Sequence, residues 1–170
     1  MRYEIKTFII FFTLLITNTG NAQYDKNIVS LKKLNTHDTL FVKYNSQGCY
    51  HHCSYSFVFY SDNGLFVSMS ELIGLMAVLK DNRLQRESGF KTTFKLSPNE
   101  IRNIEELLRY YSHNKEDGCT TVDSIFVQYK HKNQIIKNYT VVDASCEINR
   151  KENLVSFYDF MSDAKKRFSK

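Results

Sequence analysis

The sequence predicts an α+β fold in which two main helices pack on one face of an antiparallel sheet of about 4–6 strands. Segments rich in Val, Ile, Phe, Tyr and Thr recur along the chain, and short polar breaks separate them. This pattern is typical of strands joined by hairpins. Two other segments place apolar residues at helical spacing behind N-capping side chains. Because strands outnumber helices, a sheet covered by helices is the simplest way to bury both apolar surfaces.

The N-terminus has the pattern of a secretory signal peptide. Arg2 and Lys6 form a positive region, residues 8–16 are almost entirely apolar, and Gly20-Asn21-Ala22 offers the small residues that a signal peptidase reads. We expect residues 1–22 to be removed, which leaves no membrane span and a periplasmic or secreted protein. An uncleaved membrane anchor is the alternative.

The rest of the chain has the length of one domain. We expect residues 23–37 to form a flexible polar leader or a short edge piece, and residues 38–168 to form the single α+β domain. The formal net charge of +5 is modest and spread along the chain, so it does not indicate a protein that binds nucleic acid.

The first half of the domain is expected to consist mainly of strands. Residues 39–44 and 55–60 are β-rich runs, and Asp62-Asn63-Gly64 predicts a tight turn into a third strand that begins at Leu65. Polar residues 81–89 predict a surface loop.

The segment 70–79 is ambiguous. Ser68 and Glu71 fit a capping box, and a helix here would have an apolar face, so we expect a helix. The apolar face would consist of Leu72, Leu75, Met76 and Leu79. Gly74 weakens this helix, and continuation of the preceding strand is the alternative. Residues 90–96 predict a further strand.

The clearest predicted helix begins after Ser97. Ser97 suits the N-cap, Pro98 the first helical position and Glu100 the third, which together form a capping box. We expect this helix to end near Ser112. Its apolar face would consist of Ile101, Ile104, Leu107, Leu108 and Tyr111.

A last helix is predicted to open at Asn149 with Glu152. Its apolar face would consist of Leu154, Phe157, Tyr158 and Met161. Three basic residues, Lys165, Lys166 and Arg167, would lie at its C-terminal end, where the helix dipole favours positive charge.

Residues 119–146 predict a hairpin. Two β-rich runs flank Lys132-Asn133, and a two-residue turn at that point would place Cys119 opposite Cys146 where the hairpin opens. A disulfide bond between them would stabilise the fold by roughly 3.5 kcal/mol through loop-closure entropy. Counting from the turn puts this pair at a hydrogen-bonded position, where strands lie farther apart, and a bulge would shift the register.

Two groups of charged residues are candidate functional sites. Asp123 and Asp143 would fall close together across the hairpin, so a paired-carboxylate site is one interpretation and solvated strand carboxylates or caps are the simpler one. Lys130-His131-Lys132 could form a basic patch with the basic residues 165–167. Solvated turn and helix-end charges explain both groups more simply.

An ordered set of motifs resembles a known group of proteins. It comprises Cys49 between Gly48 and an aromatic residue, a Leu-Ser-x-x-x-Ile helix start, residues 118–123 as Gly-Cys-Thr-Thr-Val-Asp, and residues 143–146 as Asp-x-Ser-Cys. The set is similar to small exported Gram-negative bacterial proteins of uncharacterised function, over about residues 38–165. The resemblance implies a domain architecture and supports the 119–146 disulfide, but it implies no activity.

The segment Cys49-Tyr50-His51-His52-Cys53 is the remaining candidate site. Cysteines of exported proteins usually form disulfides, so we expect Cys49 and Cys53 to form a disulfide across a surface loop. This pairing needs a turn, because Cα atoms four residues apart in a strand are about 13 Å apart. A zinc-type site is the alternative, with Cys49, His51, His52 and Cys53 as candidate ligands, joined by His113 or His131. A thiol nucleophile beside His52 is a further alternative.

Recognised catalytic motifs are absent from the sequence. We therefore expect a non-enzymatic binding or interaction module, without a cofactor, whose partner is a protein or a component of the cell envelope. A small periplasmic metal-binding protein or thiol enzyme built on residues 49–53 is the alternative.

Overall fold

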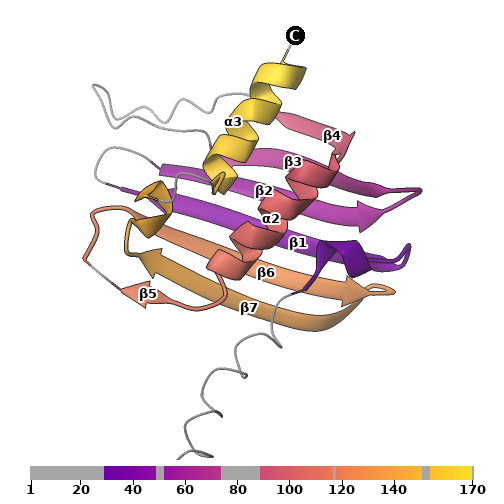
Figure 1. Ribbon diagram of the computed structural model, residues 1–170, viewed down its shortest axis with the longest axis horizontal. Coiled ribbons are helices and arrows are strands. Elements are labelled where there is room, and N and C mark those ends of the chain that lie inside the picture. Colours follow the sequence, from indigo (N-terminus) through magenta and orange to yellow (C-terminus); the bar gives the residue numbers. More distant parts are fainter. Residues whose placement is uncertain (1–28, 49–51, 74–88, 117, 151–153, 170) are drawn as a thin grey trace, which may run out of the picture.

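The computed structural model describes residues 29–48, 52–73, 89–116, 118–150 and 154–169. Its centre is a sheet with the strand order β4-β3-β2-β1-β6-β7-β5 (Figure 1). Six strands pair in antiparallel fashion, and the two-residue β5 joins β7 in parallel. The α+β class and the antiparallel sheet are therefore confirmed.

The strands are β1 (Asp38–Gln47), β2 (His52–Ser61), β3 (Leu65–Ile73), β4 (Lys91–Lys95), β5 (Lys115–Glu116), β6 (Val122–His131) and β7 (Gln134–Ala144). The α-helices are α2 (Pro98–Tyr110) and α3 (Phe157–Phe168). Two short 3₁₀ helices are η2 (Leu31–Lys33) and η3 (Glu147–Arg150).

The central strand β1 explains where the core lies. Its residues alternate between buried and partly exposed, and its buried members include Leu40, Val42 and Tyr44. We call the sheet face that carries these side chains the inner face. The ring of Phe157 from α3 lies 5.0 Å from the ring of Phe57 on β2 and 5.8 Å from that of Tyr44.

The end of α2 joins the same aromatic cluster. Tyr111, the C-cap of α2, has its ring centroid 6.3 Å from that of Phe157. Residues of both helices thus contact one another and the inner side chains of the sheet, and Figure 1 shows α2 and α3 crossing in front of the strands.

The β6–β7 hairpin has the predicted turn and an additional bulge. Lys132 and Asn133 have φ values of 47° and 66°, and two positive φ angles are what a two-residue type I′ turn requires. His131 pairs with Gln134, but the register shifts between Tyr129 and Lys130. Beyond the bulge every pair is displaced by one residue from the count that starts at the turn.

The helix expected at 70–79 is wrong for the residues that the structure describes there. Residues 70–73 continue β3, and Glu71 pairs with Tyr55 of β2. The carboxylate of Glu71 is buried and lies 2.5 Å from the Nζ of Lys165 on α3. Strand pairing and this ion pair outweigh the local helical pattern, and residues 74–79 lie outside the described residues.

The flexible leader expected at 23–37 is wrong for its described part, residues 29–37. Leu31 and Leu34 are buried in the core, and the Ser30 hydroxyl donates to Glu105 of α2 at 2.7 Å. Burial of Leu31 and Leu34 removes apolar surface from water and so favours packing of this polar segment on the domain. Residues 23–28 lie outside the described residues.

The last helix begins later than expected. It starts at Phe157 rather than Asn149, because Ser156 and Asp159 form a capping box in which each side chain meets the other's backbone N–H. Residues 147–150 form η3 instead. The three basic residues do occupy the last turn of α3, as expected.

The helix expected after Ser97 is confirmed as α2. Ser97 accepts from the Glu100 N–H, and Glu100 accepts from the Ser97 N–H at 2.7 Å. Ile104, Leu107 and Leu108 are buried. The strand expected at 90–96 is likewise present as β4.

Replacing Ser97 by Ala should lower the free energy of unfolding by about 1 kcal/mol, because the N-terminal turn of α2 loses its cap. Replacing Leu107 by Ala should cost about 2–5 kcal/mol, because it opens a cavity in the core. Urea titration of each variant measures both values. Arg102, which is exposed on α2, is the control, and its change to Ala should alter stability by less than about 0.5 kcal/mol. Equal effects at the three positions would contradict the packing described for α2.

Candidate functional site

The predicted disulfide between Cys119 and Cys146 is present, with the two Cα atoms 5.7 Å apart. The N–H of Cys119 donates to the carbonyl of Ala144 at 2.8 Å, so the chain before β6 lies against the end of β7. Gly118 and Cys146 both have positive φ angles, which turn the chain into and out of the bridge. The disulfide thus closes the end of the sheet opposite the hairpin turn.

Beside the disulfide, two buried carboxylates face each other across the hairpin. Asp123 of β6 and Asp143 of β7 are direct partners in the register and are 6% and 3% exposed. The tyrosine hydroxyls at the end of α2 donate to them, Tyr110 to Asp143 at 2.5 Å and Tyr111 to Asp123 at 3.0 Å. The expected proximity of the two carboxylates is confirmed, with the bulge bringing them into direct register.

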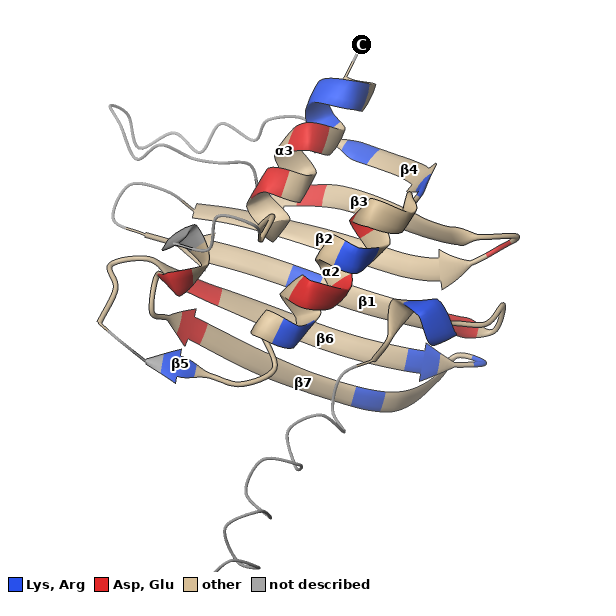
Figure 2. Ribbon diagram, in the orientation of Figure 1, with Lys and Arg blue, Asp and Glu red and all other residues tan. Residues whose placement is uncertain are grey.

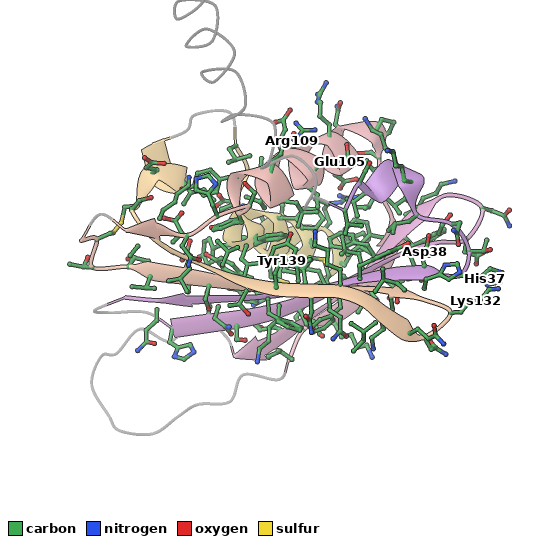
Figure 3. The ribbon with its side chains drawn as sticks, turned by 90° about the horizontal axis from the view of Figure 1, so that it is seen from below. His37, Asp38, Glu105, Arg109, Lys132 and Tyr139 are labelled. Atoms are coloured by element: carbon green, nitrogen blue, oxygen red, sulfur yellow. A yellow bond between two sulfur atoms is a disulfide. The ribbon has the colours of Figure 1, made fainter. Side chains whose placement is uncertain are left out.

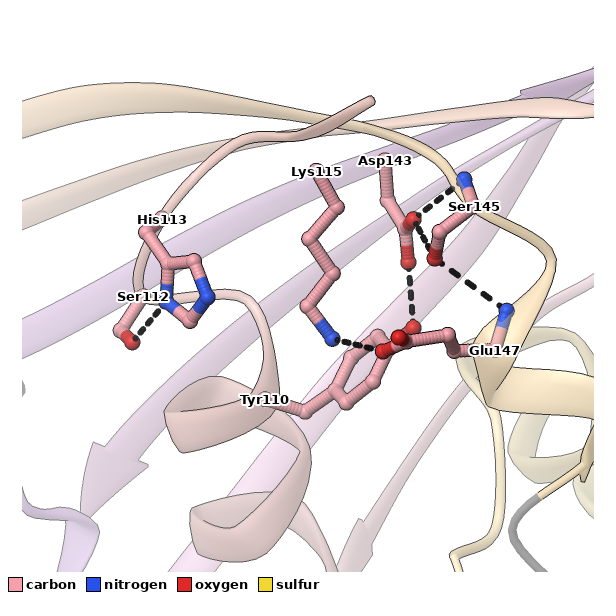
Figure 4. A network of polar contacts seen from close by, with 7 residues as sticks. All are labelled: Tyr110, Ser112, His113, Lys115, Asp143, Ser145 and Glu147. Atoms are coloured by element: carbon pink, nitrogen blue, oxygen red, sulfur yellow. Dashed lines mark hydrogen bonds and ion pairs between the residues drawn. The ribbon is translucent and has the colours of Figure 1, made fainter. Parts of the chain in front are cut away.

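Asp143 also belongs to a chain of polar contacts that leads to the surface (Figure 4). Its Oδ1 accepts from the N–H and the hydroxyl of Ser145 at 2.9 and 2.6 Å. The Glu147 side chain forms an ion pair with Lys115, whose Nζ lies 3.2 Å from the ring centroid of Tyr110. Sequence reasoning missed Tyr110, whose only signal was its place at the end of an amphipathic helix.

The surroundings shift the two carboxyl pKa values in opposite directions. Burial raises the pKa of Asp123, and the negative charge of Asp143 adds to this, although hydroxyl groups of Ser46, Tyr111 and Tyr44 oppose it. Burial also acts to raise the pKa of Asp143. Hydrogen bonds from Ser145 and Tyr110 outweigh that effect and hold this pKa below its usual value.

The geometry of Asp123 and Asp143 fits a structural role. Both carboxylates are buried and receive hydrogen bonds from their own chain, and neither lines the pocket described below. A general acid or base must reach a proton of its substrate, whereas these groups face tyrosine hydroxyls. Asp123 and Asp143 therefore fix the end of α2 to the sheet.

The residues of the 49–53 segment that the structure describes do not converge on one site. His52 and Cys53 are consecutive residues of β2, so their side chains point to opposite faces of the sheet. Cys53 is a buried free cysteine, so the expected disulfide at Cys53 is not present in the structure. The backbone at Cys53 is that of an extended strand, whereas a disulfide between cysteines four positions apart needs a turn. Cys49 and His51 lie outside the described residues.

The other histidines considered for a metal site lie apart. His131 is at the far end of β6, where its Nδ1 lies 2.8 Å from the Oδ1 of the buried Asp38. His52 is at the opposite end of the sheet, since both it and Val122 pair with Gln47. Among the residues that the structure describes, no group of three or more candidate metal ligands comes together.

The two basic segments do not form a common patch. Lys165 pairs with Glu71 of β3 and Arg167 with Glu100 of α2, at 2.5 and 2.7 Å. Residues 130–132 lie at the β6–β7 turn, which β1 and β2 separate from β3 (Figure 2). The simpler interpretation, local turn and helix-end charges, fits this arrangement.

A pocket of about 400 Å³ lies between the loop after α2 and β7. Its lining residues are Ser112, His113, Asn114, Lys137, Asn138, Tyr139, Thr140 and Val141. Among the residues that the structure describes, the lining includes the basic side chains of His113 and Lys137 and no Asp or Glu. Figure 3 shows Tyr139 near the middle of β7, away from the turn that carries Lys132. No sequence pattern predicted this pocket, because it forms only where a loop and a strand meet in the folded chain.

The pocket borders an open edge of β7. On this side β5 pairs only with Asp143 and Ala144, and the Asn114 side chain accepts from the Val142 N–H at 2.9 Å. Because strand backbone groups alternate in direction, the N–H and C=O of Thr140 and Asn138 point toward the same side. The described part of the chain places no strand against them.

Replacing both Cys119 and Cys146 by Ala should lower the free energy of unfolding by about 2–4 kcal/mol, because the unfolded chain gains freedom. Peptide mapping without reductant should recover one linked peptide pair that contains both residues. Cys146→Ala alone should leave the Cys119 thiol titratable. Recovery of either cysteine linked to Cys49 or Cys53 would contradict the pairing.

The two carboxylates should give opposite pH dependences of stability. The lowered pKa of Asp143 provides stability that is present above the ordinary aspartate pKa and is lost as the pH falls through the folded-state value. The raised pKa of Asp123 provides stability that is present below the ordinary value and is lost as the pH rises through the folded-state value.

Urea unfolding between about pH 3 and pH 8 tests this difference. Asp143→Asn should lose stability mainly at neutral pH, whereas Asp123→Asn should recover stability relative to the native protein as the pH rises. Asp62→Asn, at an exposed turn, is the control. The same pH dependence for both buried positions would refute the opposite shifts.

Comparisons with known proteins leave the function to be argued from this geometry. No family model, curated protein or solved structure matches the chain. The resemblance to small exported Gram-negative proteins therefore stays a prediction. Within the described residues, no helix has the length and apolar character needed to cross a membrane.

Proposed function

We propose that this protein is an exported, disulfide-stabilised domain that binds a protein or a cell-envelope component and catalyses no reaction. The observation that carries this proposal is the open edge of β7 beside a polar pocket. Backbone groups at a sheet edge are ready hydrogen-bonding partners for another chain. The pocket adds a place for a side chain of that partner.

Export is supported by two independent features. Residues 1–22 have the pattern of a signal peptide, and Cys119 and Cys146 form a disulfide. Structural disulfides persist mainly in oxidising compartments outside the cytosol. The proposed location is therefore the periplasm or the extracellular medium.

The arrangement of the helices supports a binding role for the edge. We infer that α2 and α3 both pack on the inner face, because Tyr111 and Phe157 contact each other and Phe157 contacts Phe57. Helices placed in this way cover the face of the sheet, and among the described residues only β5 pairs with the outer side of β7. A rigid sheet with an uncovered edge presents its hydrogen-bonding groups without a large entropic cost on binding.

The thiol-enzyme alternative has less support. Burial raises the pKa of the Cys53 thiol, which disfavours the reactive thiolate, and the side chain is fully buried. His52 lies on the opposite face of β2 and so cannot activate this sulfur. These positions favour a structural role for Cys53.

Site-specific photo-cross-linking tests the proposed binding role. A benzoyl-phenylalanine in place of Asn138, at the open edge, should give a discrete cross-linked product in the envelope or secreted fraction of the cells that naturally make the protein. The same group in place of Arg102, on the exposed side of α2, should not. Equal products from both positions, or none from position 138, would count against binding through this edge.

A further inference from the structure

We propose that the tip of the β6–β7 hairpin, residues 130–136, binds the surface of a membrane that contains anionic phospholipids. Ile135 and Ile136 enter the lipid interface. The amines of Lys130 and Lys132 contact the phosphate groups of the lipids. This contact does not involve the pocket on β7, and it depends on the proposed export, because export gives the protein access to the membranes of the cell envelope.

Two consecutive isoleucines of β7 are exposed at the hairpin tip. Ile135 is 54% exposed and Ile136 is 58% exposed, and among the described residues no other large apolar side chain is as exposed. The strand pairing passes from Lys130 with Ile135 to Tyr129 with Lys137, so Ile136 is the extra residue of the bulge. Both apolar side chains therefore lie at the surface, where transfer from water to lipid is favourable.

The sequence around the two isoleucines is basic. Residues 130–137 are Lys-His-Lys-Asn-Gln-Ile-Ile-Lys, which include three lysines and no acidic residue. Lys130 is the cross-strand partner of Ile135, so these two side chains lie beside each other on one face of the hairpin. The stem of a lysine can bury itself against apolar neighbours while its amine stays in the headgroup region. Positive charge beside exposed apolar side chains favours the surface of an anionic membrane.

Two contacts hold the hairpin tip in place on the domain. The Nδ1 of His131 lies 2.8 Å from the Oδ1 of the buried Asp38. The Lys132 N–H donates to the carbonyl of His37 at 2.9 Å, and Figure 3 shows these two residues at the same end of the molecule. Because the segment at the start of β1 fixes the tip, the isoleucines and lysines are presented together and little backbone freedom is lost on binding.

The shape and charge of the hairpin tip favour a membrane over a protein partner. Ile135 and Ile136 follow a two-residue turn at the end of the sheet, so a protein partner would need a hollow that fits two adjacent branched side chains. The lipid interface adapts to their shape. A second copy of this chain would bring the lysines of two tips together, and repulsion between like charges opposes that pairing. Anionic headgroups instead attract these lysines.

Tryptophan fluorescence tests insertion of the hairpin tip directly, because the chain contains no Trp of its own. The Ile136→Trp variant is prepared as the mature chain with its disulfide intact. It is mixed with phosphatidylcholine vesicles that contain or lack phosphatidylglycerol. With phosphatidylglycerol the emission should shift to shorter wavelength, and brominated acyl chains should quench it. Val142→Trp, at an exposed apolar position near the other end of β7, is the matched control and should show neither change.

Cosedimentation with the same vesicles separates the apolar and the charged parts of the contact. Replacing Ile135 and Ile136 together by Ser should lower the partition coefficient at least about tenfold. Lys132→Gln should lower it about fivefold, and added salt should weaken binding of the native chain because ions screen the attraction. Val142→Ser and Lys91→Gln, at exposed positions of β7 and β4, should bind as the native chain does. Urea titration checks that every variant is folded.

An unchanged emission of Ile136→Trp, or equal partition of the native chain into vesicles with and without phosphatidylglycerol, overturns the membrane contact. Full binding by the double isoleucine variant overturns insertion of the tip. Concentration-dependent dimers that the same variant abolishes would make a second copy the occupant. A cross-link from position 138 without vesicle binding would leave the proposed binding role in place and reject only the membrane contact. Vesicle binding without that cross-link would do the reverse.

Discussion

The burial of one face of the central strand β1 is the constraint on which the rest of the structure depends. Leu40, Val42 and Tyr44 lie on this face, and β2 and β6 add rows of apolar side chains on both sides. Complete burial of a large apolar side chain stabilises by roughly 1.5–3 kcal/mol. Phe157 of α3 closes the aromatic cluster over the strands, and Tyr111 joins it from the end of α2. The ring contacts of Phe157 and Tyr111 thus connect the helices to the aromatic side chains of β1 and β2.

Polar groups buried at one end of this face impose a second requirement. Asp123 and Asp143 would each be costly to bury without partners, because a desolvated carboxylate loses its hydration. The adjacent hydroxyls of Tyr110 and Tyr111 supply these partners from a single helix end. The nearby disulfide fixes the strand ends in the same region. These hydrogen bonds and the disulfide therefore constrain the end of the sheet at which β7 terminates.

Local sequence signals predicted the elements whose cause is local. The capping box at Ser97 and Glu100 defined the start of α2, and positive φ angles at Lys132 and Asn133 formed the expected turn. Local signals failed where a distant partner competed. Glu71 fits a helical cap in sequence, yet it lies in β3 because strand pairing and Lys165 of α3 hold it there. Leu31 lies in a locally polar segment, so the sequence predicted a leader there. Its burial comes from packing on the core, which no local pattern shows.

The sequence by itself determined the α+β class, the main strands and α2, because periodicity and caps depend on neighbouring residues. It also predicted the pairing of Cys119 with Cys146 from their positions at matched ends of one hairpin. Only the tertiary structure decided the partners of the two carboxylates, the separation of His52 from Cys53, and the pocket on β7. A one-residue bulge in the β6–β7 hairpin set the register that brings Asp123 opposite Asp143. The outer edge of β7 is likewise a property of strand order, because within the described residues only the two-residue β5 pairs with it.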